Sequence, residues 1–545
     1  MRKIFEILKK SGLLFYLLFV FVNYLIVDMI DDYIEFHVLI RLIIIYIVPL
    51  VVFIQTTLKY LDDKKIKDFD NKEHLKAAYP DIPKSYVADK PKGMVLGKYN
   101  NKYVFIPIGH DGLNILCTAS PGSGKSILLK AQLLANKYKG QINGKHSDYI
   151  KSWNYFLIDV DGLIYKDIYK VGGKYKATEN NELQVIELNN RSSYGFDVFY
   201  RLHADNITET TKLKTVTDIA DALIPETKSN PYFSVNAKKI LTGVLLYGIE
   251  KDMDFVSIIQ MLLRNTLDEL LTNIVTEAEQ LGNSIILDKL KGFVGKADNE
   301  SLQDVESTLK QYLDVFSYPD VIYCLQTNLH KTSPQILNDG KSNLVFAVET
   351  SMLTVYEPIF RLITMLVLRH CESEFNEDDN RYTSILIDEA ARIGKVNDLA
   401  NLMATSRKYH VNIMMLFQDL AQYRNIYGKE EASAILNLCE LKIFLSISGD
   451  AETMELLKNT VGKYHLTKQS YKKDKVLHLQ SDTNYQEDEK DIIDGPSVMN
   501  LREKDEIIII YLGKYFRFKK IRYYKDKILG PIYKEIQQYN VEQKR

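Results

Sequence analysis

Residues 120–126 read SPGSGKS and form a loop whose residue types suit the binding of phosphate. An apolar run at 114–119 (NILCTA) precedes the loop, and a run with helical spacing at 127–137 follows it. Gly122 and Gly124 supply the backbone freedom that such a loop needs to turn its N–H groups inward, and the helix directs its positive end at the bound anion. The order of strand, loop and helix therefore predicts a phosphate-binding loop.

Two side chains of this loop have specific expected roles. We expect Lys125 to reach the outer phosphates of a nucleotide and the Ser126 hydroxyl to help hold Mg²⁺. The motif G-x-x-x-x-G-K-[ST] opens with glycine, where this chain has the small residue Ala119. A glycine-rich turn without a ligand is the alternative, which the flanking strand and helix disfavour. The expected nucleotide-binding residues are Ala119, Ser120, Pro121, Gly122, Ser123, Gly124, Lys125 and Ser126.

A pair of acids far along the chain complements this loop. Residues 383–389 read TSILIDE, an apolar run that ends in two adjacent carboxylates. Such a strand is buried on both faces in a parallel sheet, so acids at its carboxyl end lie where ligands bind in open α/β folds. Asp388 is placed to ligate Mg²⁺, and Glu389 to orient or deprotonate the attacking water. Many strands end in a solvated acidic turn, but together with the lysine loop this pair predicts an ATPase that uses ATP and Mg²⁺.

The composition excludes two classes of protein. The 545 residues include 70 Lys plus Arg and 71 Asp plus Glu, so the chain is neither a uniformly basic nucleic-acid coat nor an acidic disordered tail. At about 100 to 200 residues per domain, the length allows about three units. The four cysteines lie far apart, without the paired spacing of a zinc or redox site, and are interpreted as reduced thiols.

The elements before the loop predict a membrane anchor. Residues 12–30 and 42–58 are two apolar runs, and 19 helical residues reach about 28 Å, close to the hydrocarbon thickness of a bilayer. A cleaved signal peptide or a pair of buried core helices are the alternatives. Neither fits well, because no small-residue cleavage site follows the first run and a second run comes directly after it. The sequence therefore predicts a transmembrane hairpin.

The charges beside these runs predict its orientation. Basic residues flank the outer ends of the hairpin, at Arg2, Lys3, Lys9, Lys10, Lys59, Lys64, Lys65 and Lys67. Acidic residues lie in or beside the connection, at Asp28, Asp31, Asp32 and Glu35. Positive flanks stay inside, so we expect both termini to be cytoplasmic and the protein to reside in the bacterial cytoplasmic membrane.

The segments around the two nucleotide motifs resemble the type IV coupling proteins of conjugation and type IV secretion systems. These proteins, which include the TraG/TraD-like members, are the membrane-anchored branch of the FtsK/HerA-like P-loop ATPases. The most specific segment is 406–422 (SRKYHVNIMMLFQDLAQ), which is similar to the G-R-x-Y-G-I and Q-S-L-A-Q blocks of the family. Residues 230–239 (NPYFSVNAKK) are similar to its N-P-F-F segment. Residues 154–163 (NYFLIDVDGL) resemble only in part its strand ending in D-P-K-G-E.

The resemblance implies roles for two more residues. Gln418 would end a strand beside the Asp388 strand and position the γ-phosphate or the attacking water, as Gln does in other phosphoryl-transfer sites. Arg407 would be an arginine finger inserted into the nucleotide site of a neighbouring protomer, since a guanidinium matches phosphate geometry and stays charged. Arg392 and Arg424 compete for that role on chemistry alone. The predicted catalytic set is Lys125, Asp388, Glu389, Gln418 and Arg407, with Ser126 and Asp388 as metal ligands.

The resemblance also implies an α/β fold. It consists of a RecA-like P-loop NTPase domain, an inserted all-helical domain and the N-terminal transmembrane hairpin. The expected boundaries are a membrane anchor at 1–60, a linker at 61–90, the first NTPase part at 91–240, the helical insert at 241–335 and the second NTPase part at 336–545. Helical spacing at 254–271 and 301–315 supports the insert independently.

The implied function is that of a membrane-anchored, ATP-driven DNA translocase. It would deliver single-stranded, relaxase-bound DNA to a type IV secretion channel as a homo-hexamer, with the relaxase and the channel proteins as partners. A chromosome-partition translocase of double-stranded DNA is one alternative, and a protein-export ATPase or a substrate-recruiting scaffold is another. The basic run at 514–527 contacts phosphates or anionic lipid, or is a solvated edge strand; the sequence leaves both open.

Overall fold

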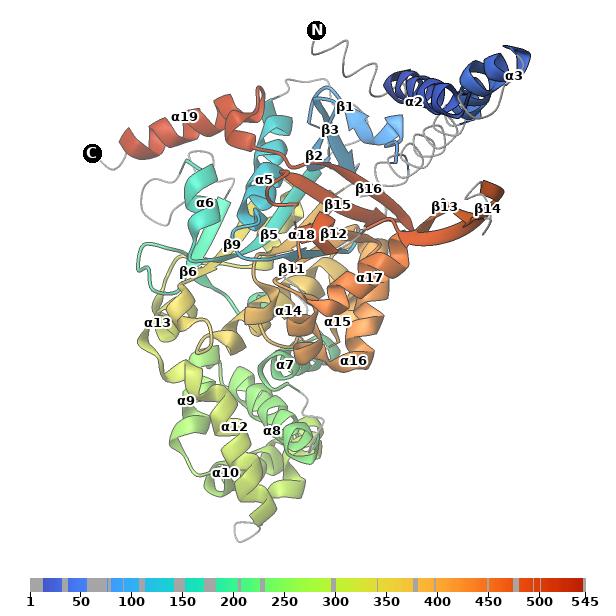
Figure 1. The fold of residues 1–545 in the computed structure, drawn as a ribbon. Coiled ribbons are helices and arrows are strands. Elements are labelled where there is room, and N and C mark those ends of the chain that lie inside the picture. Colours follow the sequence, from blue (N-terminus) through green and yellow to red (C-terminus); the bar gives the residue numbers. More distant parts are fainter. Residues whose placement is uncertain are drawn as a thin grey trace. The chain divides into compact units, whose positions relative to one another are not determined.

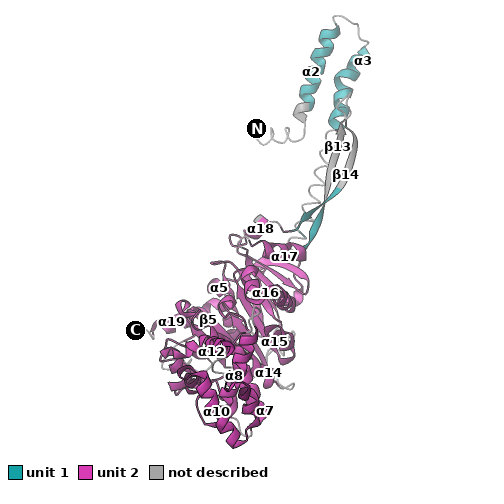
Figure 2. Ribbon diagram, turned by 90° about the horizontal axis from the view of Figure 1, so that it is seen from below, with its two compact units in different colours: residues 1–80, 462–492 teal, residues 81–461, 493–545 magenta. Residues whose placement is uncertain are grey.

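The computed structural model describes residues 13–31, 38–55, 76 and 80–542, apart from 92, 107–112, 142–151, 171–182, 204–206, 226–230, 296–299, 341, 376–380, 397, 448–449, 474–479, 494 and 500. It divides the chain into two compact units (Figure 2). One contains residues 1–80 and 462–492, and the other contains residues 81–461 and 493–545. The basic flanks predicted for the hairpin, Asp32, Glu35, most of the linker and Asn230 lie outside the described residues.

A twelve-stranded sheet forms the centre of the larger unit, in the order β1-β3-β2-β16-β15-β12-β4-β11-β10-β5-β9-β6 (Figure 1). The strands from β12 to β6 in this order run parallel, whereas β15, β16, β2, β3 and β1 pair in antiparallel fashion. Their bounds are β1 (Val87–Ala88), β2 (Met94–Tyr99), β3 (Lys102–Ile106), β4 (Ile115–Ala119), β5 (Ser152–Val160), β6 (Leu183–Glu187), β9 (Asn343–Val348), β10 (Arg381–Ile387), β11 (Val411–Phe417), β12 (Leu441–Ser446), β15 (Glu506–Tyr511) and β16 (Lys514–Lys519).

The middle strands are apolar because both faces of the sheet are covered. Every residue of β4 is buried, and successive side chains join different cores: Ile115 and Cys117 pack on one side, and Leu116 on the other. Helices α5 (Lys125–Gln141), α6 (Leu163–Ile168) and α19 (Leu529–Glu542) contribute to the first core, and α14 (Glu357–Ser373), α15 (Leu399–Ser406) and α16 (Leu420–Leu438) contribute to the second. This double cover is typical of parallel sheets.

A run of helices separates β6 from β9 in the chain. Asp254 caps α9 by accepting a hydrogen bond from the Ser257 N–H at 3.0 Å, and Gly282 ends α10 in the left-handed conformation. Gly248 of α8 allows close contact with α9, because a Cβ there would lie 2.3 Å from Cγ1 of Ile258. The helices are α7 (Glu209–Leu223), α8 (Pro231–Glu250), α9 (Phe255–Arg264), α10 (Leu267–Leu281), α11 (Ser284–Leu290), α12 (Glu300–Leu313) and α13 (Pro319–Ile322).

The smaller unit contains the N-terminal apolar helices and a two-stranded hairpin, β13 (Lys463–Lys473) and β14 (Gln480–Asp491). Helix α2 (Leu13–Asp31) occupies the first predicted span, and α3 (Val38–Leu42) begins the second. Among the described residues, only Val38–Gln55 is long and apolar enough to cross a membrane by length and composition. The prediction of two spans is therefore supported for the second alone, and a multi-pass topology is not supported.

Candidate nucleotide-binding site

The phosphate loop lies between β4 and α5, as the sequence predicts. Gly122 and Gly124 adopt φ values of 71° and 108°, in the left-handed region that favours glycine. The loop closes through a hydrogen bond from the Ser123 N–H to the Ser120 carbonyl at 3.1 Å, and α5 starts at Lys125. The first turn of α5 therefore leaves its N–H groups directed at the space above the loop.

The structure brings Lys125 and Glu389 together from segments far apart in the sequence. The Lys125 Nζ donates to Glu389 Oε2 at 2.5 Å, and each side chain is 15% exposed. Strand β11 lies between β4 and β10 and pairs in parallel with both, so the loop after β4 and the acids after β10 meet at the carboxyl edge of the sheet. This ion pair holds the ammonium group where the phosphates of a nucleotide are expected.

Asp388 is partly buried beside this pair and has unused hydrogen-bonding capacity. Its N–H donates to the Ile158 carbonyl at 3.2 Å, and this hydrogen bond joins the backbone of Asp388 to strand β5. Burial raises the pKa of Asp388 to about 6, and the nearby Lys125 opposes that shift. Its Oδ1, Oε1 of Glu389 and Oγ of Ser123 are buried without a hydrogen-bond partner in the described part of the chain. Unpartnered buried oxygens are costly, and hard oxygen donors suit a divalent cation such as Mg²⁺.

Gln418 directly follows β11, between the loop strand and the acidic strand. Its N–H donates to Oε1 of Gln422 at 3.3 Å, and Asp419 caps α16 by accepting from the Gln422 N–H at 2.8 Å. The sequence predicts a strand adjacent to the Asp388 strand, and this adjacency is confirmed. The Gln418 amide therefore starts from the same edge of the sheet as Asp388.

Arg407 lies at the other edge of the sheet. It opens a short helical turn, Arg407–Tyr409, before the first residue of β11, Val411, which pairs with Thr383 near the start of β10. At about 3.3 Å per residue, the strand separates Arg407 from the carboxyl edge by about 20 Å. Its side chain is 57% exposed, with Nη1 3.8 Å from Oε1 of Glu440. The structure therefore does not bring Arg407 to the Lys125 site of its own chain.

The two competing arginines lie nearer the carboxyl edge. Arg392 is exposed in the short helical turn that follows Glu389. Arg424 belongs to α16, and its Nη1 contacts Oε1 of Glu452 at 2.9 Å. Within one chain, both arginines therefore lie nearer than Arg407 to the end of the sheet that carries Lys125.

Asp159 and Asp161 belong to the segment that matches D-P-K-G-E in part, and both make structural hydrogen bonds. Asp159 is buried and accepts hydrogen bonds from the N–H groups of Ile164 and Tyr165, at 3.0 and 2.7 Å for Oδ2, which holds the start of α6. Burial raises the pKa of Asp159 to about 7, and these backbone bonds oppose the shift. Asp161 accepts from the N–H and the hydroxyl of Thr350, both at 2.6 Å. Both acids therefore fasten the strand ends beside the site.

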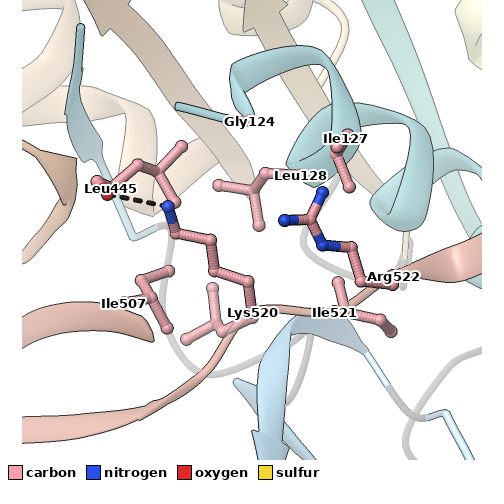
Figure 3. Close-up of a pocket in the computed structure, with 9 residues that line it drawn as sticks. Gly124, Ile127, Leu128, Leu445, Ile507, Lys520, Ile521 and Arg522 are labelled. Atoms are coloured by element: carbon pink, nitrogen blue, oxygen red, sulfur yellow. Dashed lines mark hydrogen bonds between the residues drawn. The ribbon is translucent and has the colours of Figure 1, made fainter. Parts of the chain in front are cut away.

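The C-terminal segment brings cations to the phosphate loop that the sequence did not predict (Figure 3). The Lys520 Nζ donates to the carbonyls of Ser123 and Leu445, both at 2.8 Å. Burial lowers the pKa of Lys520 to about 8. Arg502 lies beside Gly122, where a Cβ would come within 3.4 Å of the Arg502 Nη2. The basic run at 514–527 marks this segment, but no local pattern shows which part of the fold it meets.

Residues 164–544 match the family described as "Type IV secretory system Conjugative DNA transfer". This match covers more than half of the chain. The chain belongs to this family. The predicted coupling-protein resemblance is confirmed.

Individual relatives are distant. The type IV secretion system-coupling protein VirD4 of Bartonella henselae is 22% identical over 366 residues, which cover 65% of this chain and 56% of that protein. The conjugal transfer protein TraG of Rhizobium radiobacter is 25% identical over 146 residues, 27% of this chain and 22% of that protein. The chain thus spans a little over half the length of the VirD4 relative.

Solved structures share the fold. The plasmid coupling protein TrwB in complex with the ATP analogue ADPNP has a TM-score of 0.60 at 14% identity, over 82% of this chain and 96% of that chain. TrwB in a trigonal form with sulphate has a TM-score of 0.59 at 15% identity, over 83% and 92%. This likeness confirms the predicted RecA-like α/β fold of the coupling-protein family.

Proposed function

We propose that this coupling-family protein hydrolyses ATP with Mg²⁺ at the Lys125 site. The observation that carries the proposal is the meeting of the Lys125 ammonium with Glu389 beside the buried, unpartnered Oδ1 of Asp388. TrwB, which shares the fold, has been described in complex with ADPNP and with ADP and Mg²⁺. Ser126 and Asp388 would hold the cation, which neutralises charge on the phosphates.

The side chains around the pair divide the remaining work. Phosphate binding would draw Lys125 away from Glu389, and the freed carboxylate would accept a proton from the attacking water. Gln418, at the end of the neighbouring strand, would orient that water. Arg407 of an adjacent protomer would stabilise the transferring phosphoryl group. The predicted loop residues, Ala119 to Ser126, would surround the phosphates, and all of them except Pro121 have a backbone N–H to donate.

The chemistry would drive DNA through a homo-hexamer at the bacterial cytoplasmic membrane. The apolar helix Val38–Gln55 supports an anchor, and its Val38 and Leu39 side chains are 71% and 64% exposed, as suits contact with lipid. We extend the anchor to a hairpin within residues 1–60, followed by a linker at 61–90, with both termini cytoplasmic. The substrate would be single-stranded, relaxase-bound DNA, and the partners the relaxase and the channel proteins of a type IV secretion system.

The proposed parts of the larger unit are an NTPase domain at 91–240 and 336–545 and a substrate-receiving helical insert at 241–335. Family membership favours the coupling role over chromosome partition by a double-stranded DNA translocase. A protein-export ATPase or a scaffold would differ in its response to DNA.

The test uses full-length protein in lipid nanodiscs. We expect single-stranded DNA to accelerate ATP hydrolysis, and Lys125→Ala to abolish both hydrolysis and plasmid transfer in cells. Lys137→Ala is the matched control, because Lys137 lies on the same helix with its ammonium 3.8 Å from the centre of the Tyr169 ring, away from the phosphate loop. Full plasmid transfer by the Lys125→Ala variant would reject the motor and leave the scaffold.

A further inference from the structure

Arg502 lies against the phosphate loop and is available to bind an anion. It belongs to the turn that precedes β15, where its carbonyl accepts a hydrogen bond from the Asp505 N–H at 3.3 Å. A Cβ on Gly122 would lie 3.4 Å from Nη2 and 3.7 Å from Nη1 of this arginine, so both nitrogens are at contact distance from the loop. The Arg502 side chain is exposed, and within the described residues it has no hydrogen bond or ion pair. Its N–H donors therefore remain available beside the loop.

The charges near Arg502 leave this side of the loop positive. The Lys520 ammonium is bound to two carbonyl oxygens, which do not cancel its charge. Burial lowers the pKa of Lys520 most, and the positive charges of Arg522 and Arg502 lower it further, whereas Asp505 opposes them. Asp505 is itself paired with Arg522, with 2.7 Å between its Oδ1 and Nη2. An anion on this side of the loop would therefore reduce the repulsion between three cations.

The strand order shows that Arg502 and Glu389 approach the loop from opposite sides. Strand β4, which leads into the loop, lies between β11 and β12. On the β11 side, the next strand is β10, whose carboxyl end is followed by Asp388 and Glu389. On the β12 side, the next strand is β15, which runs antiparallel to β12 and so begins at the carboxyl edge of the sheet. The turn that contains Arg502 therefore reaches the loop from the β12 side.

This arrangement selects the phosphates that Arg502 can reach. In phosphoryl transfer, the attacking oxygen and the leaving oxygen lie roughly in line, on opposite sides of the transferred group. Glu389 is the proposed acceptor of the proton of the attacking water, so the water lies on the β10 side. The leaving group, which consists of the inner phosphates, then extends toward the β12 side and Arg502.

We propose that Arg502 binds the inner phosphates of the nucleotide on its own chain and so retains ADP after hydrolysis. The inference rests on the proposed ATPase function and adds to it a residue that controls product release. A guanidinium suits this task, because its fork matches two phosphate oxygens and its charge is permanent. The same contact exists before and after hydrolysis, so it strengthens nucleotide binding without an effect on the chemical step.

Calorimetry on the full-length protein in nanodiscs tests this with ADP and with the ATP analogue ADPNP, both with Mg²⁺. Arg502→Ala should weaken the binding of both nucleotides by the same factor, about tenfold, because it removes a charged hydrogen bond common to them. Displacement of fluorescent ADP should be about tenfold faster, since affinity losses of this kind appear mostly in dissociation. Arg502→Lys, which keeps the charge but not the fork, should show a smaller loss.

A kinetic measurement separates this role from that of an arginine finger. The rate constant of a single turnover at saturating ATP should change by less than about twofold in Arg502→Ala. The matched control is Lys504→Ala, which removes an exposed positive charge from the same turn. The Lys504 carbonyl accepts a hydrogen bond from Lys519 at 2.7 Å, and alanine keeps this backbone group. The control should alter neither affinity, and thermal unfolding of each variant identifies any general loss of folding.

Three outcomes would overturn the inference alone. An unchanged ADP affinity in folded Arg502→Ala would show that Arg502 makes no contact with the inner phosphates. A large fall in the single-turnover rate constant would show that it acts on the transferred phosphoryl group. Equal losses of affinity in Lys504→Ala would show that only the total charge of the turn matters. Failure of both nucleotides to bind the folded wild type would instead overturn the proposed function, and this inference with it.

Discussion

The two edges of the parallel sheet differ in what they contain. At the carboxyl edge, Lys125, Glu389 and Asp388 lie within a partly buried cluster whose charges and oxygens face one another. At the amino edge, Arg407 extends from a turn and is 57% exposed, with a weak contact to Glu440. The proposed metal and phosphate ligands therefore lie at one end of the strands, and the proposed finger lies at the other.

If Arg407 is the arginine finger, a single chain is an incomplete catalyst. The length of β11 keeps Arg407 about 20 Å from the carboxyl edge, and a strand cannot shorten to close that gap. If Arg407 acts on a nucleotide, a second copy must present its amino edge to the carboxyl edge of the first. A head-to-tail contact of this kind generates a ring when the rotation closes.

The largest expected effect follows from removal of the Arg407 side chain. Arg407→Ala should lower ATP hydrolysis by the assembled protein about 10³-fold, because it removes charge stabilisation of the transition state. ATP affinity should change little, because an arginine finger stabilises the charge of the transition state more than that of the bound nucleotide. The measurements are steady-state hydrolysis and calorimetric binding, with the neighbouring exposed cation substituted in Lys408→Ala as the control.

Mixing variants distinguishes action in trans from action in cis. Rings that combine Arg407→Ala and Lys125→Ala chains contain some interfaces with an intact finger and an intact loop. Partial recovery of hydrolysis is therefore expected on mixing. If mixing the two variants restores no hydrolysis at any ratio, Arg407 does not act in trans, and the finger is assigned to Arg392 or Arg424.

Asp388→Asn tests the proposed metal ligand at the carboxyl edge. Loss of the negative charge should lower hydrolysis about 10²-fold and raise the Mg²⁺ concentration needed for half-maximal activity. The measurement is a Mg²⁺ titration of hydrolysis at saturating ATP. An unchanged Mg²⁺ requirement would show that Asp388 does not ligate the cation.

A smaller effect concerns the helix that carries Lys125. Asp167 of α6 accepts hydrogen bonds from Lys130 of α5 at 2.8 Å and from Tyr533 and Gln537 of α19, both at 3.0 Å. Asp167→Ala would leave these donors without a partner and should lower the free energy of unfolding by about 2 kcal/mol. Denaturant unfolding measures this value.

The exposed pair between Lys170 and Glu535 provides the control for that variant. Glu535 lies on α19, as the Asp167 partners Tyr533 and Gln537 do. Glu535→Ala should lower the free energy of unfolding by less than about 0.5 kcal/mol, because exposed ion pairs contribute little. Equal losses of unfolding free energy in the two variants would show that the hydrogen bonds of Asp167 stabilise the fold no more than an exposed ion pair does.

The smallest expected effect is a pH dependence from Lys520. Burial lowers its pKa to about 8 in the folded protein, below the ordinary value of 10.5, so the unfolded chain binds more protons between these values. Stability should therefore rise with pH from about 8 to 10.5, relative to Lys520→Met, by about 1 kcal/mol, because the half-buried amine is screened by solvent. Thermal unfolding of both proteins at pH 7.5 to 9.5 checks the sign. A falling difference would contradict it.

Local patterns in the sequence predicted the parts of the carboxyl edge. The strand, glycine turn and helix around Lys125 form one continuous segment, and the apolar run before Asp388 favours a buried strand. Since the carboxyl ends of parallel strands meet at one edge, their proximity followed. The position of Gln418 beside Asp388 followed in the same way from the run 411–417.

Other features depend on contacts that no local pattern records. Arg407 precedes β11 in the chain. Its place at the amino edge can therefore be inferred only once the direction of β11 in the sheet is known. The approach of Lys520 to the Ser123 carbonyl depends on the antiparallel addition of β15 and β16 to β12. Asp161, which departs from the family pattern, has a partner in Thr350 that lies 189 residues away. Of the two apolar runs, only the second meets the length and composition of a span among the described residues.

The strand order also bears on how this protein is made. Strand β4 pairs on both sides with strands formed by residues 411–446, which leave the ribosome long after it does. Until then its apolar side chains have no sheet to join. Long-range pairing of this kind slows folding and leaves aggregation-prone intermediates exposed. The nascent chain should therefore depend on chaperones that bind unfolded segments through most of its synthesis.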